Sequence, residues 1–175
     1  MAPEQSLDAR SVTAAADAGC TLVSLVATAL ARIDSARFRV IVLGGSRPPA
    51  DRPANCVTTY GLTETGSGIV YDGRPIDGVE VAIDDDGGIR VRGPMLLRCY
   101  RDGTDPVDAD GWFPTGDLGA WLPDGRLHVA GRRGDLIITG GENVWPETVE
   151  DALRRHPGVR DVAVAGVADA EWGQR

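Results

Sequence analysis

The sequence contains no lysine: all 18 of its basic residues are arginine. Any mechanism that needs a lysine ammonium group within these 175 residues is therefore excluded. Acidic residues outnumber basic ones by 26 to 18, which gives a formal net charge of −8. Nucleic acids and anionic membranes are bound by basic surfaces, so this charge argues against both as partners. It is compatible with an enzyme that acts on small molecules.

Cysteine is scarce, and long apolar runs are missing. Cys20, Cys56 and Cys99 are odd in number and far apart, which favours reduced thiols over a disulfide framework or a zinc site. The most apolar stretch, residues 12–31, is interrupted by Asp17 and follows no basic cluster. A signal peptide and a membrane span are therefore not expected. Together these features predict a cytoplasmic protein.

Glycine and proline are plentiful, at 23 and 11 residues, and predict many tight turns. Residues 1–11 are polar and irregular, and we expect them to be loose. Residues 21–33 place their apolar side chains at the spacing of one helical face. Residues 38–43 and 57–60 read as two buried strands, each running into glycine. The first third is therefore predicted to be α/β, with its loops gathered at strand ends, where open sheets bind ligands.

The middle of the sequence predicts antiparallel β-structure. Residues 79–83 and 89–91 alternate between apolar and polar across an Asp/Gly turn, which is the pattern of a hairpin. Residues 118–121 and 126–130 repeat the arrangement around a second turn. This region predicts a β-subdomain.

The pattern changes again after the arginine- and glycine-rich linker at 131–134. A short strand at 136–138, a helix that begins near Pro146 and a strand at 159–167 form a strand–helix–strand unit. We interpret residues 1–131 as the distal part of one domain and residues 132–175 as the start of a second. The sequence stops before the core of this second domain is expected to be complete, which predicts exposed apolar surface and possible self-association.

Four short segments could carry chemistry. The first is Tyr60-Gly61-Leu62-Thr63-Glu64-Thr65, which presents an aromatic ring, a hydroxyl and a carboxylate from one glycine-containing loop. The ring can stack on a purine, the hydroxyl can contact a phosphate oxygen, and the carboxylate can hold Mg²⁺. Taken alone, the composition of the segment favours an ordinary polar surface turn.

The other three segments follow in order along the chain. In Trp112-Phe113-Pro114-Thr115-Gly116-Asp117, the aspartate lies near a strand end, where a carboxylate can accept two hydrogen bonds from a ribose diol. The linker Gly131-Arg132-Arg133-Gly134-Asp135 comes next, followed by Gly140-Gly141-Glu142-Asn143-Val144. Each segment is a weak signal alone, but their order and separation together are specific.

This constellation resembles the adenylate-forming superfamily, which includes acyl-CoA synthetases, peptide-synthetase adenylation domains and luciferases. The resemblance runs from about Thr21 to Arg175. It implies that ATP and Mg²⁺ activate a small carboxylic acid as an acyl-adenylate, and that the acyl group then passes to a thiol, commonly that of CoA. Within the superfamily, residues 60–68 and 138–146 look most like the o-succinylbenzoate–CoA ligases of menaquinone synthesis.

The resemblance also implies roles for single residues of the nucleotide site. Thr63 and Glu64 would be catalytic, with Glu64 as the Mg²⁺ ligand and Thr63 as the contact to the nucleotide phosphate. Tyr60 would stack on adenine, on the loop that Gly61 opens. The remaining nucleotide-binding positions would be the wall of the adenine and acyl pocket and the ribose contacts: Gly44, Gly45, Ser46, Asp117 and Arg132.

Two further positions would serve the second half-reaction. Gly134 would be the hinge about which the small domain turns, because glycine tolerates large changes in φ and ψ. Gly141 would line the channel through which the CoA thiol arrives. The alternative for Gly141 is that it only supplies a positive φ to a turn.

The superfamily also uses two lysines, one on a phosphate-binding loop upstream and one near its carboxyl end, and this sequence contains neither. We therefore expect the chain to be inactive alone. The alternative interpretation is a truncated product without catalysis, which retains weak nucleotide binding or interacts with other proteins.

Overall fold

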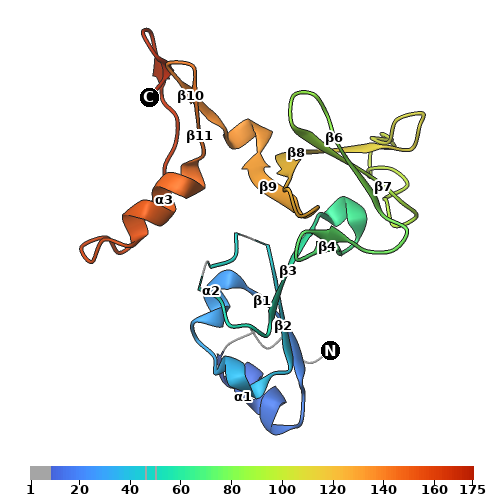
Figure 1. Ribbon diagram of the computed structural model, residues 1–175, viewed down its shortest axis with the longest axis vertical. Coiled ribbons are helices and arrows are strands. Elements are labelled where there is room, and N and C mark those ends of the chain that lie inside the picture. Colours follow the sequence, from blue (N-terminus) through green and yellow to red (C-terminus); the bar gives the residue numbers. More distant parts are fainter. Residues whose placement is uncertain (1–8, 46, 50) are drawn as a thin grey trace. The chain divides into compact units, whose positions relative to one another are not determined.

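The computed structural model describes residues 9–45, 47–49 and 51–175 (Figure 1). These residues form two compact units. The first comprises the described residues through Val79 together with Gly93–Arg98, and the second comprises Glu80–Arg92 together with Cys99–Arg175. Both combine sheets with short helices, so the predicted mixed α/β class is confirmed. The boundary predicted between residues 131 and 132 stays a prediction.

The first unit is built on a five-stranded sheet in the order β1-β2-β3-β4-β5. Strands β1, β2 and β3 are parallel, whereas β4 and β5 join them in antiparallel pairs. Its elements are α1 (Ala9–Asp17), β1 (Leu22–Val26), α2 (Ala27–Leu30), η1 (Ser35–Arg37), β2 (Val40–Gly44), β3 (Cys56–Gly61), η2 (Thr63–Thr65), β4 (Gly68–Tyr71) and β5 (Arg74–Pro75). Because the first three strands are parallel, their carboxyl ends lie at one edge of the sheet.

The core of this unit lies against β2. Ile41 and Leu43 alternate with less buried neighbours, so both point to the same face of the strand. Val12 of α1 and Leu30 of α2 belong to the same buried cluster, as does Phe38 before the strand. Burial of this apolar surface holds the two short helices on the sheet.

The helix predicted at residues 21–33 is wrong over its first half, which forms strand β1. Leu22 to Val26 pair in parallel register with Val40 to Gly44, and only the following four residues are helical. Short apolar runs satisfy both periodicities, and a neighbouring strand decides the outcome here. Residues 9–11, expected to be loose, begin helix α1. Leu22 and Val26 are more than half exposed on this edge strand, and the predicted self-association stays a prediction.

The second unit contains two four-stranded sheets with the orders β6-β7-β8-β9 and β11-β10-β13-β12. Every pairing in them is antiparallel. Ile89, Val91 and Phe113 are almost completely buried in the first of these sheets. The elements are β6 (Glu80–Ile83), β7 (Gly88–Arg92), β8 (Phe113–Trp121), β9 (Leu127–Arg132), η3 (Arg133–Asp135), β10 (Ile137–Thr139), β11 (Glu142–Val144), α3 (Pro146–Arg154), β12 (Ala168–Asp169) and β13 (Gly173–Gln174).

Most predictions for this unit are confirmed. Both hairpins form, and helix α3 begins at Pro146 with an acidic residue in its first turn and Arg154 in its last. The strand predicted at residues 159–167 is wrong over most of its length: residues 159–166 form no strand, and only Val167 continues the β12–β13 pair, through two backbone hydrogen bonds of 2.9 Å with Arg175. The Val164 amide instead donates to Glu150 Oε1 on α3, at 2.9 Å. The backbone at Val164 is thereby bonded to helix α3 and not to a strand.

The entry to β8 is held by two arginines around Trp112. The guanidinium groups of Arg90 and Arg92 lie 5.5 and 4.6 Å from the centroid of the indole ring, within cation–π range. Arg92 also forms a two-point hydrogen-bonded pair with Glu80, at 2.9 and 2.6 Å. The residues that precede Asp117 are thereby tied to strands β6 and β7.

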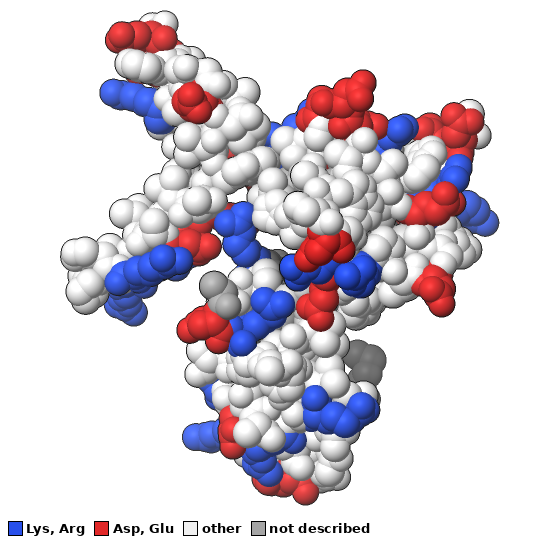
Figure 2. Space-filling view, viewed as in Figure 1, with Lys and Arg blue, Asp and Glu red and all other residues white. Residues whose placement is uncertain are grey.

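Charged side chains are interspersed over the visible face, with acidic and basic groups adjoining one another (Figure 2). Among the described residues, no helix has both the length and the apolar character needed to cross a membrane. The predicted cytoplasmic location stays a prediction.

Candidate nucleotide-binding site

The loop predicted to bind the nucleotide phosphates connects β3 to β4 in the first unit. It consists of the single 3₁₀ turn Thr63–Thr65, followed by Gly66 in the left-handed region at φ +67°. The two strands pair at Gly61 and Gly68, with a shift of register beside Tyr60. A Cβ on Gly61 would collide with the carbonyl oxygen of Ser67 and lie 2.7 Å from the Cα of Gly68. Glycine is therefore required here because two backbones touch.

Thr65 holds this loop together, a role that the sequence did not reveal. Its side chain is buried, at 3% exposure. Its hydroxyl accepts a hydrogen bond from the Leu62 amide at 2.9 Å and lies 2.9 and 2.7 Å from the carbonyl oxygens of Leu62 and Ser67. A threonine hydroxyl that bonds to the backbone three residues earlier is a recognisable turn signal. The second threonine of the motif could therefore have been interpreted as a turn residue.

The predicted functional side chains lie on the accessible part of the same loop. Thr63 is exposed, whereas Tyr60 and Glu64 are half-buried. Among the described residues, no group of three or more acidic, histidine or cysteine side chains could hold a metal ion. Mg²⁺ is commonly held by one or two carboxylates together with substrate phosphates and water, so a lone Glu64 next to a threonine hydroxyl fits it. Glu64 would be its protein ligand, and the ion would neutralise phosphate charge when bound.

The predicted pocket wall follows the neighbouring parallel strand. Gly44 ends β2 and Gly45 has φ +79°, while Ser46 lies outside the described residues. Thr59 of β3 fills the space over Gly44, because its Cγ2 atom would lie 3.0 Å from a Cβ there. The Thr59 hydroxyl oxygen is buried and has no hydrogen-bond partner among the described residues. This oxygen lies over Gly68 of β4, where a Cβ would be 1.8 Å from it, so Thr59 makes glycine necessary at that position.

Asp117 and Arg132, in the second unit, are brought together by strand pairing. They lie opposite each other in the β8–β9 register, and Arg132 Nε lies 3.2 Å from Asp117 Oδ1. Asp117 is only 6% exposed, so a facing guanidinium group offsets the cost of burying its charge. The prediction had placed Arg132 merely near the ribose site, and the structure shows a direct ion pair.

Thr115 orders the turn of backbone around this pair. Its hydroxyl donates to the carbonyl oxygen of Ile89 at 2.8 Å and accepts from the Asp117 amide at 3.1 Å. Arg132 also donates to the Thr115 carbonyl oxygen. Between them, Gly116 has φ +77°. The buried carboxylate is thus fixed by its own strand and by the next one.

The linker after β9 is anchored on its upstream side. Arg133 forms an ion pair with Asp86 on the β6–β7 turn at 3.0 Å, and this partner, aided by the Gly88 amide, lowers the pKa of the Asp86 carboxyl. Gly134 has no described heavy atom within 4 Å of a Cβ built on it and no positive φ. Its surroundings therefore leave room for movement, and its role as a hinge stays a prediction.

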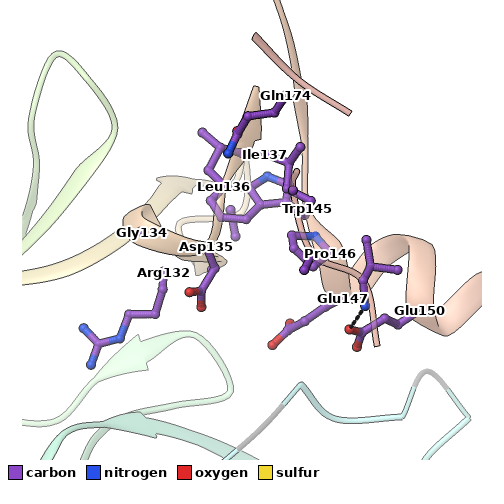
Figure 3. A pocket seen from close by; sticks show the side chains of 15 residues that line it. Arg132, Gly134, Asp135, Leu136, Ile137, Trp145, Pro146, Glu147, Glu150 and Gln174 are labelled. Atoms are coloured by element: carbon purple, nitrogen blue, oxygen red, sulfur yellow. Dashed lines mark hydrogen bonds between the residues drawn. The ribbon is translucent and has the colours of Figure 1, made fainter. Parts of the chain in front are cut away.

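A cavity of about 470 Å³ lies between this linker and helix α3 (Figure 3). Arg132, Asp135, Trp145 and Glu147 are among its lining residues. The Trp145 ring lies against the linker backbone, because a Cβ on Gly131 would be 2.9 Å from it. A single aromatic side chain, at the start of helix α3, therefore contacts the end of β9.

The glycine pair of the fourth segment forms the two-residue turn between β10 and β11, where Thr139 pairs with Glu142. Gly140 and Gly141 have φ +57° and +86°, the two positive values of a turn that matches the twist of a hairpin. A Cβ on Gly141 would have no described heavy atom within 4 Å. Both interpretations of Gly141 therefore stand: its φ favours glycine, and open space surrounds it.

The predicted residues fall into three local groups. Gly44, Gly45, Tyr60, Gly61, Thr63 and Glu64 follow adjacent strands of the first unit. Asp117 and Arg132 form one pair in the second unit. Gly141 lies on a separate small sheet of that unit.

Comparisons with known proteins give the chain curated relatives that are named 2-succinylbenzoate–CoA ligases. No family profile matches the chain. It is 43% identical over 160 residues to a probable 2-succinylbenzoate–CoA ligase of Mycobacterium tuberculosis, an alignment that covers 84% of this chain and 40% of the relative. It is 34% identical over 202 residues to the 2-succinylbenzoate–CoA ligase of Listeria monocytogenes, covering 97% and 43%. The chain thus spans about two fifths of the length of these curated relatives.

The solved structures that the chain resembles include an o-succinylbenzoate CoA synthetase and an amide bond synthetase. The o-succinylbenzoate CoA synthetase (MenE) of Bacillus subtilis, in complex with its acyl-adenylate intermediate, matches with a TM-score of 0.82 at 30% identity, covering 94% of this chain and 42% of that one. The amide bond synthetase McbA of Marinactinospora thermotolerans matches with a TM-score of 0.78 at 31% identity, covering 94% and 42%.

These similarities place the chain in the adenylate-forming superfamily, to whose carboxyl-proximal region it corresponds. Within the superfamily, the curated relatives that it resembles are 2-succinylbenzoate–CoA ligases. The resemblance inferred from residues 60–68 and 138–146 is therefore confirmed.

Proposed function

We propose that this chain supplies the carboxyl-proximal portion of an ATP-dependent 2-succinylbenzoate–CoA ligase. The activity is activation of the acid to an acyl-adenylate with release of pyrophosphate, followed by transfer of the acyl group to CoA. The observation that carries the proposal is the buried, strand-paired Asp117–Arg132 unit at the position where the superfamily pattern requires a ribose ligand. The name of the acid comes from the curated relatives.

The geometry supports specific roles for the chain's own residues in adenylate formation. Asp117 is fixed by Arg132 and by the Thr115 hydroxyl, so it can accept hydrogen bonds from ribose without reorganising. Thr63 and Glu64 stand on a loop that Thr65 locks from beneath. Thr59 lies between the strands that carry two of the glycines, with its Cγ2 atom over Gly44 and its hydroxyl oxygen over Gly68.

Thioester formation would use the turn at Gly140 and Gly141. Open space around Gly141 suits the passage of a thin pantetheine arm close to the backbone. Gly141→Leu should slow transfer to CoA more than adenylate formation. Because the φ of +86° penalises any side chain, Gly141→Asn, which tolerates the left-handed region better, is the control for backbone strain.

The chain alone should not form an acyl-adenylate. It contains no lysine to neutralise phosphate charge or to orient the substrate carboxylate, and removing one such group typically costs about 3 kcal/mol of transition-state stabilisation. Pyrophosphate exchange with ATP and 2-succinylbenzoate measures this directly. A robust rate from the purified 175-residue chain would contradict the expectation.

The decisive experiment places residues 21–175 into the Bacillus subtilis enzyme in exchange for the matching region. The chimera regains the lysine-bearing segments from its host, and we expect ATP–pyrophosphate exchange that depends on 2-succinylbenzoate. Glu64→Gln should lower that exchange by roughly a hundredfold or more. Asp51→Asn, which neutralises an exposed carboxylate elsewhere in the first unit, should leave it unchanged. A folded chimera with no exchange above the Glu64→Gln level would overturn the proposal.

A second candidate function is nucleotide binding without catalysis. The complete absence of lysine favours it for the chain by itself. Equilibrium dialysis of AMP against the purified chain tests it, with Asp117→Asn as the variant expected to weaken retention. Equal retention by both proteins would remove this candidate.

A further inference from the structure

The two glycines of the β10–β11 turn have different surroundings. A Cβ on Gly140 would lie 2.6 and 2.9 Å from Cε3 and Cζ3 of the Trp172 indole. A Cβ on Gly141 would meet no described heavy atom within 4 Å. The space that a side chain at Gly140 would occupy is thus already filled by Trp172, from the turn between β12 and β13.

Trp172 is held in this position by its backbone on both sides. The Asp169 carboxylate accepts hydrogen bonds from the amides of Glu171 and Trp172, at 2.9 and 3.0 Å. The Trp172 carbonyl oxygen accepts from the Gly140 amide at 2.9 Å. The following residue, Gly173, pairs with Thr139 at the end of β10.

A second contact joins the same two segments next to the Thr139–Gly173 pair. The Ile138 amide donates to the side-chain oxygen of Gln174 at 2.8 Å. The indole of Trp172 nevertheless remains 52% exposed. The ring of Trp172 thus packs against Gly140 on one face and contacts solvent on the other. It covers the Gly140 side of the turn and leaves the Gly141 side open.

We propose that Trp172 is a positioning residue for the Gly140-Gly141 turn: its indole fixes the backbone at Gly140, so that Gly141 alone presents free space to a ligand. The functional part of this inference rests on the proposed role of the turn in thioester formation. A two-residue turn without side chains is otherwise free to move, since glycine populates positive and negative φ about equally. The indole removes that freedom on one side.

The structural part is tested on the full chain by amide hydrogen exchange at Gly140, whose N–H group bonds to the Trp172 carbonyl oxygen. Trp172→Ala should raise exchange at Gly140 by about tenfold, because loss of the ring loosens the turn. Trp172→Phe should restore most of the protection. Trp121→Ala, which removes another exposed tryptophan from the same unit, is the matched control and should leave Gly140 unchanged. Unaltered exchange in Trp172→Ala would overturn the inference.

A double-mutant cycle tests whether the ring and the glycine act as a pair. Gly140→Ala should push the ring off the turn and destabilise the chain towards urea. In Gly140→Ala/Trp172→Ala the collision is gone, so the double variant should be less destabilised than the sum of the two single variants. Additive effects would contradict the proposed packing.

The functional part is tested in the chimera that carries residues 21–175. Trp172→Ala and Gly140→Ala should both lower the rate of thioester formation more than the rate of adenylate formation, with Phe at 172 restoring it. A rise only in the KM for CoA, confined to Trp172→Ala, would instead indicate direct contact with CoA and overturn the positioning role. If exchange at Gly140 responds as expected but neither half-reaction changes, Trp172 still holds the turn, and the proposed role of the turn in thioester formation is wrong.

Discussion

The loop at residues 62–67 and the Asp117–Arg132 pair differ in how they combine the residues that maintain the fold with the residues predicted to bind the nucleotide. In the loop, the residues that give shape are buried and the residues predicted to act are accessible: Thr65 is 3% exposed, whereas Thr63 is exposed. In the pair, the carboxylate predicted to act is itself buried and bonded into the sheet. Stability and function should therefore separate by mutation in the loop and fall together in the pair.

The largest effect is expected where the loop has no room at all. Gly61→Ala would force a Cβ against the Ser67 carbonyl oxygen and the Gly68 backbone, and should lower the free energy of unfolding by about 3 kcal/mol or more. Gly134→Ala, at a glycine with open surroundings and no positive φ, is the matched control and should stay within about 0.5 kcal/mol. Urea unfolding followed by circular dichroism measures both. Equal stability of the two variants would show that the β3–β4 contact is not tight.

The pair comes next. Asp117→Asn weakens a buried ion pair whose partner, Arg132, remains half exposed, so the loss of stability should be about 2 kcal/mol. Asp124→Asn removes a carboxylate from an exposed pair with Arg126 on the same hairpin, and should cost about 1 kcal/mol or less. In the chimera, Asp117→Asn should also weaken nucleotide binding. If it lost binding while remaining fully stable, the contrast between pair and loop would fail.

Two adjacent residues sharpen the contrast inside the loop. Thr65→Val deprives the Leu62 amide of its buried acceptor and should cost about 1–2 kcal/mol of stability. Glu64→Gln should leave stability within about 0.5 kcal/mol while removing activity from the chimera. Thermal melts and pyrophosphate exchange on the same two proteins are sufficient. A destabilised Glu64→Gln variant would mean that the loop does not divide its tasks.

The smallest expected effect is on the melting temperature at acidic pH. The ion pair with Arg133, followed by the Gly88 amide, holds the pKa of Asp86 below its ordinary value. A carboxyl group whose pKa is lower in the folded state stabilises the fold above its unfolded pKa and loses that contribution as the pH falls through the folded value. Asp86→Asn should therefore lose slightly less melting temperature than the parent chain between about pH 5 and pH 3. Identical acid responses would exclude a contribution from this pair.

Elements with local sequence signals were predicted correctly, whereas elements that depend on distant parts of the chain were not. Hairpins announced by Asp/Gly turns and the helix that begins at Pro146 were predictable because their signals are local. Residues 22–26 were misread because their assignment depends on β2, a partner further along the chain. The segment around Val164 was misread because the Val164 amide bonds to a helix side chain. The residues proposed to carry the chemistry were predicted from motifs, whereas the structural roles of Thr65 and Trp172 rest on contacts that only the folded chain shows.

The close contact between the backbones of Gly61 and Gly68 also has a consequence for how this loop evolves. Together with Thr65, these glycines are constrained by the shape of the loop alone, whatever reaction takes place above it. Selection for a folded chain would preserve them even after selection for turnover had ceased. Gly61, Thr65 and Gly68 are therefore a record of architecture, and a descendant could keep them long after losing the reaction that the loop once served.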